Sequence, residues 1–469
     1  MKRKRSRKHD ILEDFTYVDR RRAVKKSKYL TSPYDDAVYE STATKLQKDV
    51  STYAWSTALD KLPEKDAART SVLSKAWLDT WYTFPVLSFC TSKIMEKSPA
   101  QPMENSGRMR KILGFCDHVK RNIQRFRDQS LTIEEFKLKV DCVGLDHISN
   151  DVDIWLKLAC ECGVEIIEYY QDVSVGQDQY HVLPMCVIEA KSITKLVLEG
   201  YIKIDPTFMN HSIKFFSLRV LSLWSVLLGD QHAINNLISF CPLIESITLR
   251  YCLVLGSNDV KKENLKSLRI IGLQKLKSVK ALGIQDVSID APSLENLCCW
   301  PFASVATLKI DFDRCINLKE LDTGIVTNKW FLEQFPKFPF LESLKLKFCK
   351  MPEKTDISSV RLKELELIFC YNLKEVNIDT PNLLSCEYHD TIGASGPTIS
   401  FLRISSQLKV NIWIFVSDLC NLRKFVQDIK PNNVLTSLWI SINGRIGPSW
   451  LAGFIPSTKY QTLDHNESS

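Results

Sequence analysis

Apolar residues recur along much of the chain in segments of the form L-x-x-L-x-L, where L is Leu or a similar residue. Apolar and polar positions alternate at the end of each segment, which is the pattern of a β-strand with one buried face. Nine segments fit, and their first apolar residues are Ile193, Leu218, Ile244, Leu265, Leu294, Leu318, Leu341, Leu362 and Leu383. The pattern predicts a series of short strands at similar intervals along the chain.

The regular spacing of these strands indicates a repeat architecture. A period of roughly 20 to 29 residues is that of a leucine-rich repeat, in which a helix or an irregular segment returns the chain after each strand. One repeat cannot bury its apolar face alone, so neighbouring repeats stack. We therefore predict an α/β repeat fold, a leucine-rich-repeat solenoid (horseshoe), over residues 108–440. Its first and last repeats, including VLTSLWI with Leu435, Leu438 and Ile440, are expected to be irregular, and residues 441–469 to form a C-terminal cap and tail.

The same alternation places the polar positions of each strand on the concave face of the solenoid. Aromatic and Arg side chains dominate the energetics of protein interfaces, so this face is the predicted site for a protein substrate. A solvated face without a partner is the alternative. The candidate substrate-binding residues are Trp224, Arg250, Arg269, Trp300, Lys345 and Lys347, of which the last two form a predicted basic group with the two arginines.

The chain contains 15 cysteines, an odd number, spread without a pairing pattern. We expect free thiols in a reducing compartment. Cys252, Cys349 and Cys370 stand three residues after the last apolar template position, where the repeat takes Asn or Cys, and are predicted to be structural turn residues. No C-x-x-C pair with a matching partner occurs, so no metal site is expected.

A second pattern precedes the repeats, in LPEKDAARTSVLSKAWLDTW from Leu62 to Trp81. Apolar residues fall there at steps of three to five, which predicts a short amphipathic helical unit. On the pattern alone this unit is either core or a docking surface. Residues 46–90 are predicted as one helical module, and residues 91–107, with MEKSPAQPMENSG, as a linker.

This run resembles the second half of the F-box of plant F-box/leucine-rich-repeat proteins, including FBD-like members. The residues that match are Leu62, Pro63, Val72, Leu73 and Trp77. The resemblance implies that the module binds a Skp-type adaptor on the cullin scaffold of a ubiquitin ligase complex, while the repeats capture a protein substrate whose identity the sequence does not give. It also implies a non-catalytic subunit. The first half of the module, TKLQKDVSTYAWSTALDKLP, is a few residues longer than the family pattern. The alternative is therefore a nuclear leucine-rich-repeat scaffold without ligase coupling.

The net charge of +7 is concentrated at the N-terminus. Residues 1–30 contain twelve Lys or Arg and four Asp or Glu, which gives +8 and leaves −1 for the rest. We expect residues 1–45 to form a basic disordered tail. Its clusters resemble a bipartite nuclear localisation signal read by an import receptor, so we predict the nucleus, with the cytoplasm as a second compartment; nonspecific polyanion binding is the alternative. The signal residues are Lys2, Arg3, Lys4, Arg5, Arg20, Arg21, Arg22, Lys25 and Lys26.

Several classes of function lack support in the sequence. There is no apolar run long enough to span a membrane and no secretory signal, so we expect no membrane insertion. No phosphate-binding loop and no G-x-G-x-x-G, H-E-x-x-H or G-x-S-x-G motif is present, so we expect neither an enzyme nor a cofactor. No aromatic platform for sequence-specific nucleic-acid binding accompanies the basic tail.

Overall fold

The computed structural model describes residues 83–92, 105–141, 148–172, 179–205, 215–256, 261–302, 308–312, 314–392, 397–416 and 435–442. The predicted adaptor-binding residues Leu62 to Trp77 and the predicted nuclear localisation residues lie outside these ranges. The chain divides into two units, Met1–Glu165 and Ile166–Ser469.

The described part of the first unit combines two helices with two strands. These are β1 (Val86–Cys90), α7 (Asn105–Asp128), β2 (Glu135–Val140) and α8 (Ser149–Glu161). β1 pairs with β2 in parallel, and the rings of Phe115 and Trp155 join the two helices edge to face at 5.8 Å. Two predicted boundaries change. Val86–Cys90 is a strand rather than the end of a helical module, and α7 begins at Asn105, inside the predicted linker.

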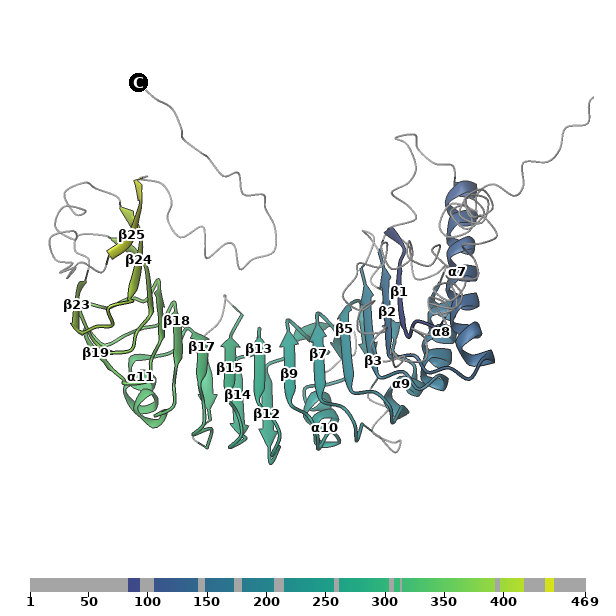
Figure 1. Ribbon diagram of the computed structural model, residues 1–469, viewed down its shortest axis with the longest axis horizontal. Coiled ribbons are helices and arrows are strands. Elements are labelled where there is room, and N and C mark those ends of the chain that lie inside the picture. Colours follow the sequence, from purple (N-terminus) through teal and green to yellow (C-terminus); the bar gives the residue numbers. More distant parts are fainter. Residues whose placement is uncertain are drawn as a thin grey trace, which may run out of the picture. The chain divides into compact units, whose positions relative to one another are not determined.

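The second unit is built on one long parallel sheet, the main sheet. Its strands pair in the order β3, β5, β7, β9, β13, β15, β17, β18, β20, β22, β24 and β25 (Figure 1). Their bounds are β3 (Ile166–Gln171), β5 (Lys195–Gly200), β7 (Val220–Trp224), β9 (Ser246–Arg250), β13 (Ser278–Leu282), β15 (Asn296–Trp300), β17 (Glu320–Gly324), β18 (Ser343–Lys347), β20 (Glu364–Ile368), β22 (Ser385–Ile392), β24 (Lys409–Val416) and β25 (Leu435–Ile442). This arrangement fits the predicted leucine-rich-repeat solenoid.

The segments that return the chain are mostly strands, which corrects the α/β character predicted for the repeats. One return sheet has the order β11 (Lys262–Asn264), β10 (Leu253–Leu255), β8 (Leu227–Leu228), β6 (Ile202–Ile204) and β4 (His181–Val182). The others are β12 (Ser267–Ile271), β14 (Asp286–Asp290) and β16 (Lys309–Asp311), and β19 (Lys354–Ser358), β21 (Glu375–Asp379) and β23 (Thr398–Arg403). Helices in the described part of this unit are short: α9 (Met185–Glu189), α10 (Ala233–Ser239), α11 (Asn328–Gln334) and the 3-10 turn Phe335–Lys337.

Main and return strands both bury alternate apolar side chains. On the main sheet Leu249 and Leu344 are almost fully buried, and on the return strands Leu268 and Val287 are equally buried. Each such side chain contributes roughly 1.5 to 3 kcal/mol when removed from water. The predicted turn cysteines are buried as well. Burial raises the pKa of the Cys252 thiol to about 12.

One predicted strand belongs to a return sheet and not to the main sheet. NLKSLRI, with Leu265, Leu268 and Ile270, was expected beside β9 on the main sheet, but it forms β12, which pairs with β14. The strand beside β9 is β13, whose buried residues are Val279 and Ala281. The prediction is wrong because a return strand buries every second residue in the same core and so carries the same pattern.

No helix of the described part is long and apolar enough to span a membrane.

Candidate functional site

The candidate site is the solvent face of the main sheet, formed by the side chains that alternate with the buried leucines. Because the parallel strands pair in register, side chains at the carboxyl ends of the strands form a row, here called the end row. Within it Trp224 pairs with Arg250, then Leu282 with Trp300. Further along the sheet the row contains Gly324, Lys347, Ile368, His389 and Trp413.

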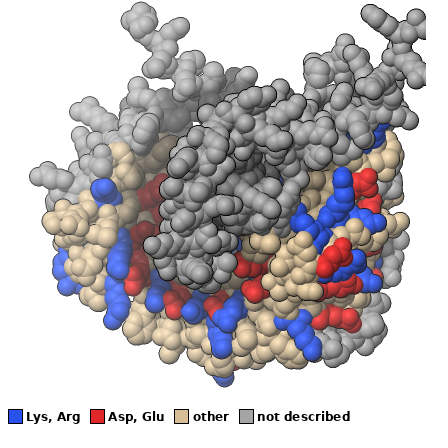
Figure 2. All heavy atoms as spheres, turned by 45° about the vertical axis from the view of Figure 1, so that its right-hand side comes forward, with Lys and Arg blue, Asp and Glu red and all other residues tan. Residues whose placement is uncertain are grey.

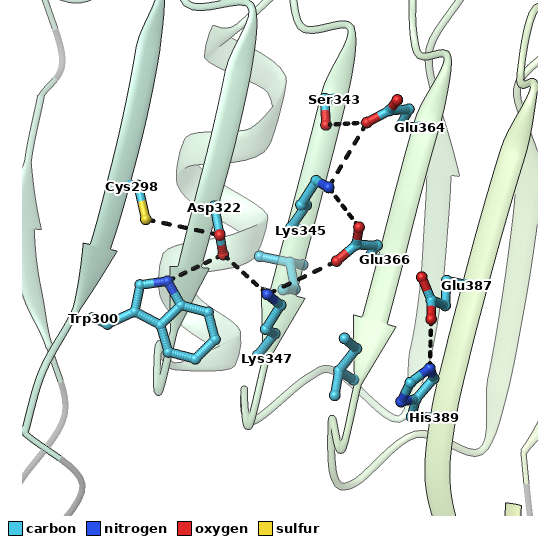
Figure 3. A network of polar contacts seen from close by, with 12 residues as sticks. Cys298, Trp300, Asp322, Ser343, Lys345, Lys347, Glu364, Glu366, Glu387 and His389 are labelled. Carbon is cyan, nitrogen blue, oxygen red and sulfur yellow. Dashed lines mark hydrogen bonds and ion pairs between the residues drawn. The ribbon is translucent and has the colours of Figure 1, made fainter. Parts of the chain in front are cut away.

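Trp300 on β15 contacts residues of the two neighbouring strands β17 and β18 (Figure 3). Its indole N–H donates to the Asp322 carboxylate at 3.1 Å, and Lys347 Nζ lies 4.7 Å from the ring centroid. The neighbouring strand provides Gly324, where a Cβ would lie 3.2 Å from the indole ring and 2.9 Å from the Lys347 carbonyl oxygen. A side chain at position 324 would therefore displace the ring.

The two lysines of β18 lie in a network of carboxylates (Figure 3). Lys345 Nζ lies 2.5 Å from Glu366 and 3.8 Å from Glu364. Lys347 Nζ lies 3.7 Å from Asp322 and 3.8 Å from Glu366. Burial opposes the charge on Lys345, but the hydrogen bond to Glu366 and the fields of both glutamates outweigh burial and raise the pKa of Lys345 above its ordinary value. Each lysine is thus neutralised within the sheet.

His389 continues the row on β22. Its Nε2 lies 2.7 Å from Glu387, and its ring stacks on Trp413 at 5.4 Å between centroids. The ring of Phe369 approaches His389 edge to face at 6.4 Å. This end of the row presents an aromatic cluster of three rings.

Toward the other end of the row, Arg250 on β9 lies over Trp224 on β7. The guanidinium carbon is 5.4 Å from the indole centroid, which is within the range of a cation–π contact. Trp224 is 40% exposed. The pair differs from the lysines of β18 because no ion pair involves Arg250 within the described ranges.

Comparisons with known proteins agree with this repeat geometry. Residues 152–324 match the family model for the leucine-rich repeats of the FBD-associated F-box protein At5g56370. Among Arabidopsis thaliana proteins, F-box/LRR-repeat protein 13 is 24% identical over 66% of this chain and 63% of its own length. F-box/LRR-repeat protein At1g48400 is 28% identical over 58% of this chain and 53% of its own length. FBD-associated F-box protein At3g52670 is 24% identical over 56% of this chain and 55% of its own length. Over these residues the chain is similar to plant F-box/leucine-rich-repeat proteins. It spans between half and two thirds of the length of these three relatives.

Five of the six predicted substrate-binding residues lie on the solvent face of the main sheet: Trp224, Arg250, Trp300, Lys345 and Lys347. Arg269 does not. It lies on return strand β12, where its backbone N–H donates to Asn235 of α10. The predicted basic group is therefore wrong, because Arg269 is on another sheet and both lysines are paired with carboxylates. Lys and Arg lie beside Asp and Glu over the surface seen in Figure 2.

Three aromatic residues of the repeat edge are not among the residues predicted from the sequence. Tyr251, Phe348 and Phe369 directly follow strands β9, β18 and β20, and each has a positive φ between 49° and 55°. Their backbone N–H groups donate to the next strand at 2.7 to 2.9 Å, which compensates the unfavourable conformation. Phe348 stacks on Phe369 at 5.5 Å. Their position, directly after the last residue of a strand, is a signal in the sequence by which these edge residues could have been found.

No group of three or more His, Cys, Asp or Glu side chains that could hold a metal ion occurs in the part of the chain that the structure describes.

Proposed function

We propose that this protein is a substrate-recognition adaptor of a Skp–cullin–F-box ubiquitin ligase. The F-box-like segment that contains Leu62 to Trp77 would bind the Skp-type adaptor, and the solvent face of the main sheet would bind a protein target. The observation that carries the proposal is the likeness of the repeats to those of F-box/leucine-rich-repeat proteins, together with the F-box-like residues Leu62 to Trp77. Such an adaptor needs no catalytic group of its own, because it supplies proximity while the ligase supplies the chemistry.

The geometry of the end row supports target binding. Large aromatic side chains contribute most to a protein interface when they are already held in place, because little side-chain entropy is then lost on binding. Asp322, Lys347 and Gly324 hold Trp300 in this way. We propose that Trp300 is an anchor for the target, and that the basic N-terminal clusters direct the protein to the nucleus through an import receptor.

The test is a pull-down of purified Skp-type adaptor by the full chain, compared with the variant L62D/W77D. We expect binding by the wild type and its loss in the variant. A matched control, I271D/L332D, makes the same kind of change at two apolar residues that are 66% and 60% exposed, and should bind as the wild type does. Absence of binding by folded wild-type protein would reject the ligase proposal. The scaffold without ligase coupling, which the lengthened first half of the module favours, would then be the better explanation.

A further inference from the structure

We propose that four neighbouring strands of the main sheet, β7, β9, β13 and β15, bind an acidic segment of the protein target, and that Arg250 and Lys280 contact its anionic group. This inference rests on the proposed function, because it specifies the chemistry of the target that the solvent face accepts.

The first support is the charge pattern of the sheet. The solvent face of these four strands, here called the acid-free half, has no Asp or Glu. Its polar residues are hydroxyl, amide, thiol and cationic groups, among them Ser222, Thr248, Ser278, Asn296 and Cys298. Acidic residues return on both sides, with Glu199 on β5 and Asp322 on β17. Arg250 and Lys280 therefore have no acidic neighbour on their own strands or on adjacent strands of the main sheet.

The second support is the position of the two cations. Thr248 pairs with Lys280 and Arg250 pairs with Leu282, so Arg250 and Lys280 are diagonal neighbours on adjacent strands. A strand spacing of about 4.8 Å and a rise of about 3.3 Å per residue place their Cα atoms about 8 Å apart. The two side chains can therefore converge on one carboxylate or phosphate group.

The third support is the state of the Arg250 side chain. Its Nε is buried and has no hydrogen-bond partner within the described residues, and neither Arg250 nor Lys280 forms an ion pair there. The Trp224 ring holds the guanidinium in place, which lowers the entropy lost when a ligand binds. An anion that binds here displaces no carboxylate, whereas one that binds Lys345 must compete with Glu366 at 2.5 Å.

The size of the cationic site favours a peptide. Two cations that form no ion pair among the described residues match one anionic side chain, whereas nucleic-acid binding draws on many phosphate contacts spread over a basic surface. Trp224 and Tyr251, which are 40% and 38% exposed, provide apolar contact area near Arg250. The expected ligand is thus an acidic residue, Asp, Glu or a phosphorylated residue, beside apolar residues in a segment of the target.

The experiment selects short random peptides, displayed on phage, against the immobilised full chain. We expect the wild type to enrich peptides that contain Asp or Glu. The charge-reversal variant R250E/K280E should enrich Lys or Arg instead. The matched control R269E/K309E makes the same change of charge on return strands β12 and β16, at two exposed residues, and should enrich the same acidic peptides as the wild type.

An enriched peptide is then synthesised and its affinity measured by fluorescence anisotropy. We expect R250E/K280E, and the milder R250Q/K280Q if the former does not fold, to bind at least about tenfold more weakly than the wild type. R269E/K309E should bind equally well. Replacing the acidic residue by phosphoserine distinguishes the sources: tighter binding identifies phosphate as the anion, and weaker binding identifies a carboxylate.

Two results would overturn the proposal: no enrichment of acidic peptides on the wild type, or equal weakening by the two pairs of substitutions. The adaptor pull-down is a separate measurement on the same protein. A chain that fails to bind the adaptor but selects acidic peptides would lose the ligase function and keep this site.

Discussion

Two adjacent groups of four strands in the main sheet, called here the acid-free half and the ion-paired half, differ in how their charged side chains are paired. In the acid-free half, Arg250 and Lys280 lie among hydroxyl and aromatic side chains, without ion pairs in the described structure. In the ion-paired half, formed by β17, β18, β20 and β22, Lys345 and Lys347 lie between carboxylates of the neighbouring strands. Trp300 marks the border, because it belongs to β15 and donates to Asp322 of β17.

The difference shows that the buried core of the repeats determines the backbone, whereas the side chains on the solvent face can differ from repeat to repeat. Side chains at equivalent positions, most of them apolar and Leu249 and Leu344 among them, are buried under both halves, so the two halves share one architecture. A lysine in one half already has its counterion, and a cation in the other half is available for a ligand. Charge counted along the sequence therefore does not equal charge available for binding.

The largest expected effect tests whether a buried leucine contributes equally to the stability of the fold under both halves. Leu249→Ala, beneath the acid-free half, and Leu344→Ala, beneath the ion-paired half, should each lower the free energy of unfolding by about 2 to 5 kcal/mol. Both side chains are almost fully buried, whereas Leu384 is 43% exposed and its replacement by Ala should cost far less. Urea denaturation provides the measurement. A cost well below that range for only one of the two buried leucines would show that the core differs between the halves.

The next effect concerns the border between the halves. Gly324→Ala should cost about 1 to 3 kcal/mol, because the new Cβ would lie 2.9 Å from the Lys347 carbonyl oxygen and 3.2 Å from the Trp300 ring. A shift in Trp fluorescence should accompany the loss, measured in the same urea titration. Gly114→Ala, where nothing lies within 4 Å, is the control and should not destabilise the protein. A fully stable G324A variant would contradict the packing described for Trp300.

A smaller effect compares the cations of the two halves directly. K345M/K347M should destabilise the protein by about 1 to 2 kcal/mol, because Asp322, Glu364 and Glu366 are left close together without a counterion. R250M/K280M should cost less than about 1 kcal/mol, since it removes only the contact with Trp224. Thermal and urea unfolding of both variants give the comparison. Equal losses would mean that the two halves do not differ in internal pairing.

The repeat fold could be predicted from the sequence because burial of alternate leucines produces an alternation of apolar and polar residues that is visible within each strand. The same physics limited the prediction. Leu268 of β12 and Val279 of β13 are buried alike, so periodicity could not distinguish the return strand from the main strand. The step from Ile244 to Leu265 is among the shortest of the series and the step from Leu265 to Leu294 is the longest, and this unevenness was the available sign of the error.

The site was predicted less well than the fold, because it depends on neighbours from different repeats. Lys347 and Asp322 belong to successive repeats and meet only when the register of β17 and β18 is known. Arg250 and Lys347 look equivalent in the sequence, yet only the latter has carboxylates on both adjacent strands. Pairwise register, which a single sequence does not provide, decides which cation is available.

The smallest effect is the pH dependence of the ion-paired half. The pKa of Lys345 is raised in the folded protein, so its pairing contributes stability that is fully present below the ordinary value of about 10.4 and is lost as the pH rises through the raised value. The difference in unfolding free energy between the wild type and Lys345→Gln, at most about 1 kcal/mol for a partly exposed pair, should be constant up to about pH 9.5 and narrow above about 10.4. Lys345→Arg stays charged in this range and should keep its advantage over Lys345→Gln. The contrary result is a difference in unfolding free energy between the wild type and Lys345→Gln that stays unchanged at high pH. It would mean that Lys345 stabilises the sheet by packing rather than by its charge. The contrast between the two halves would then not rest on ion pairing at this position.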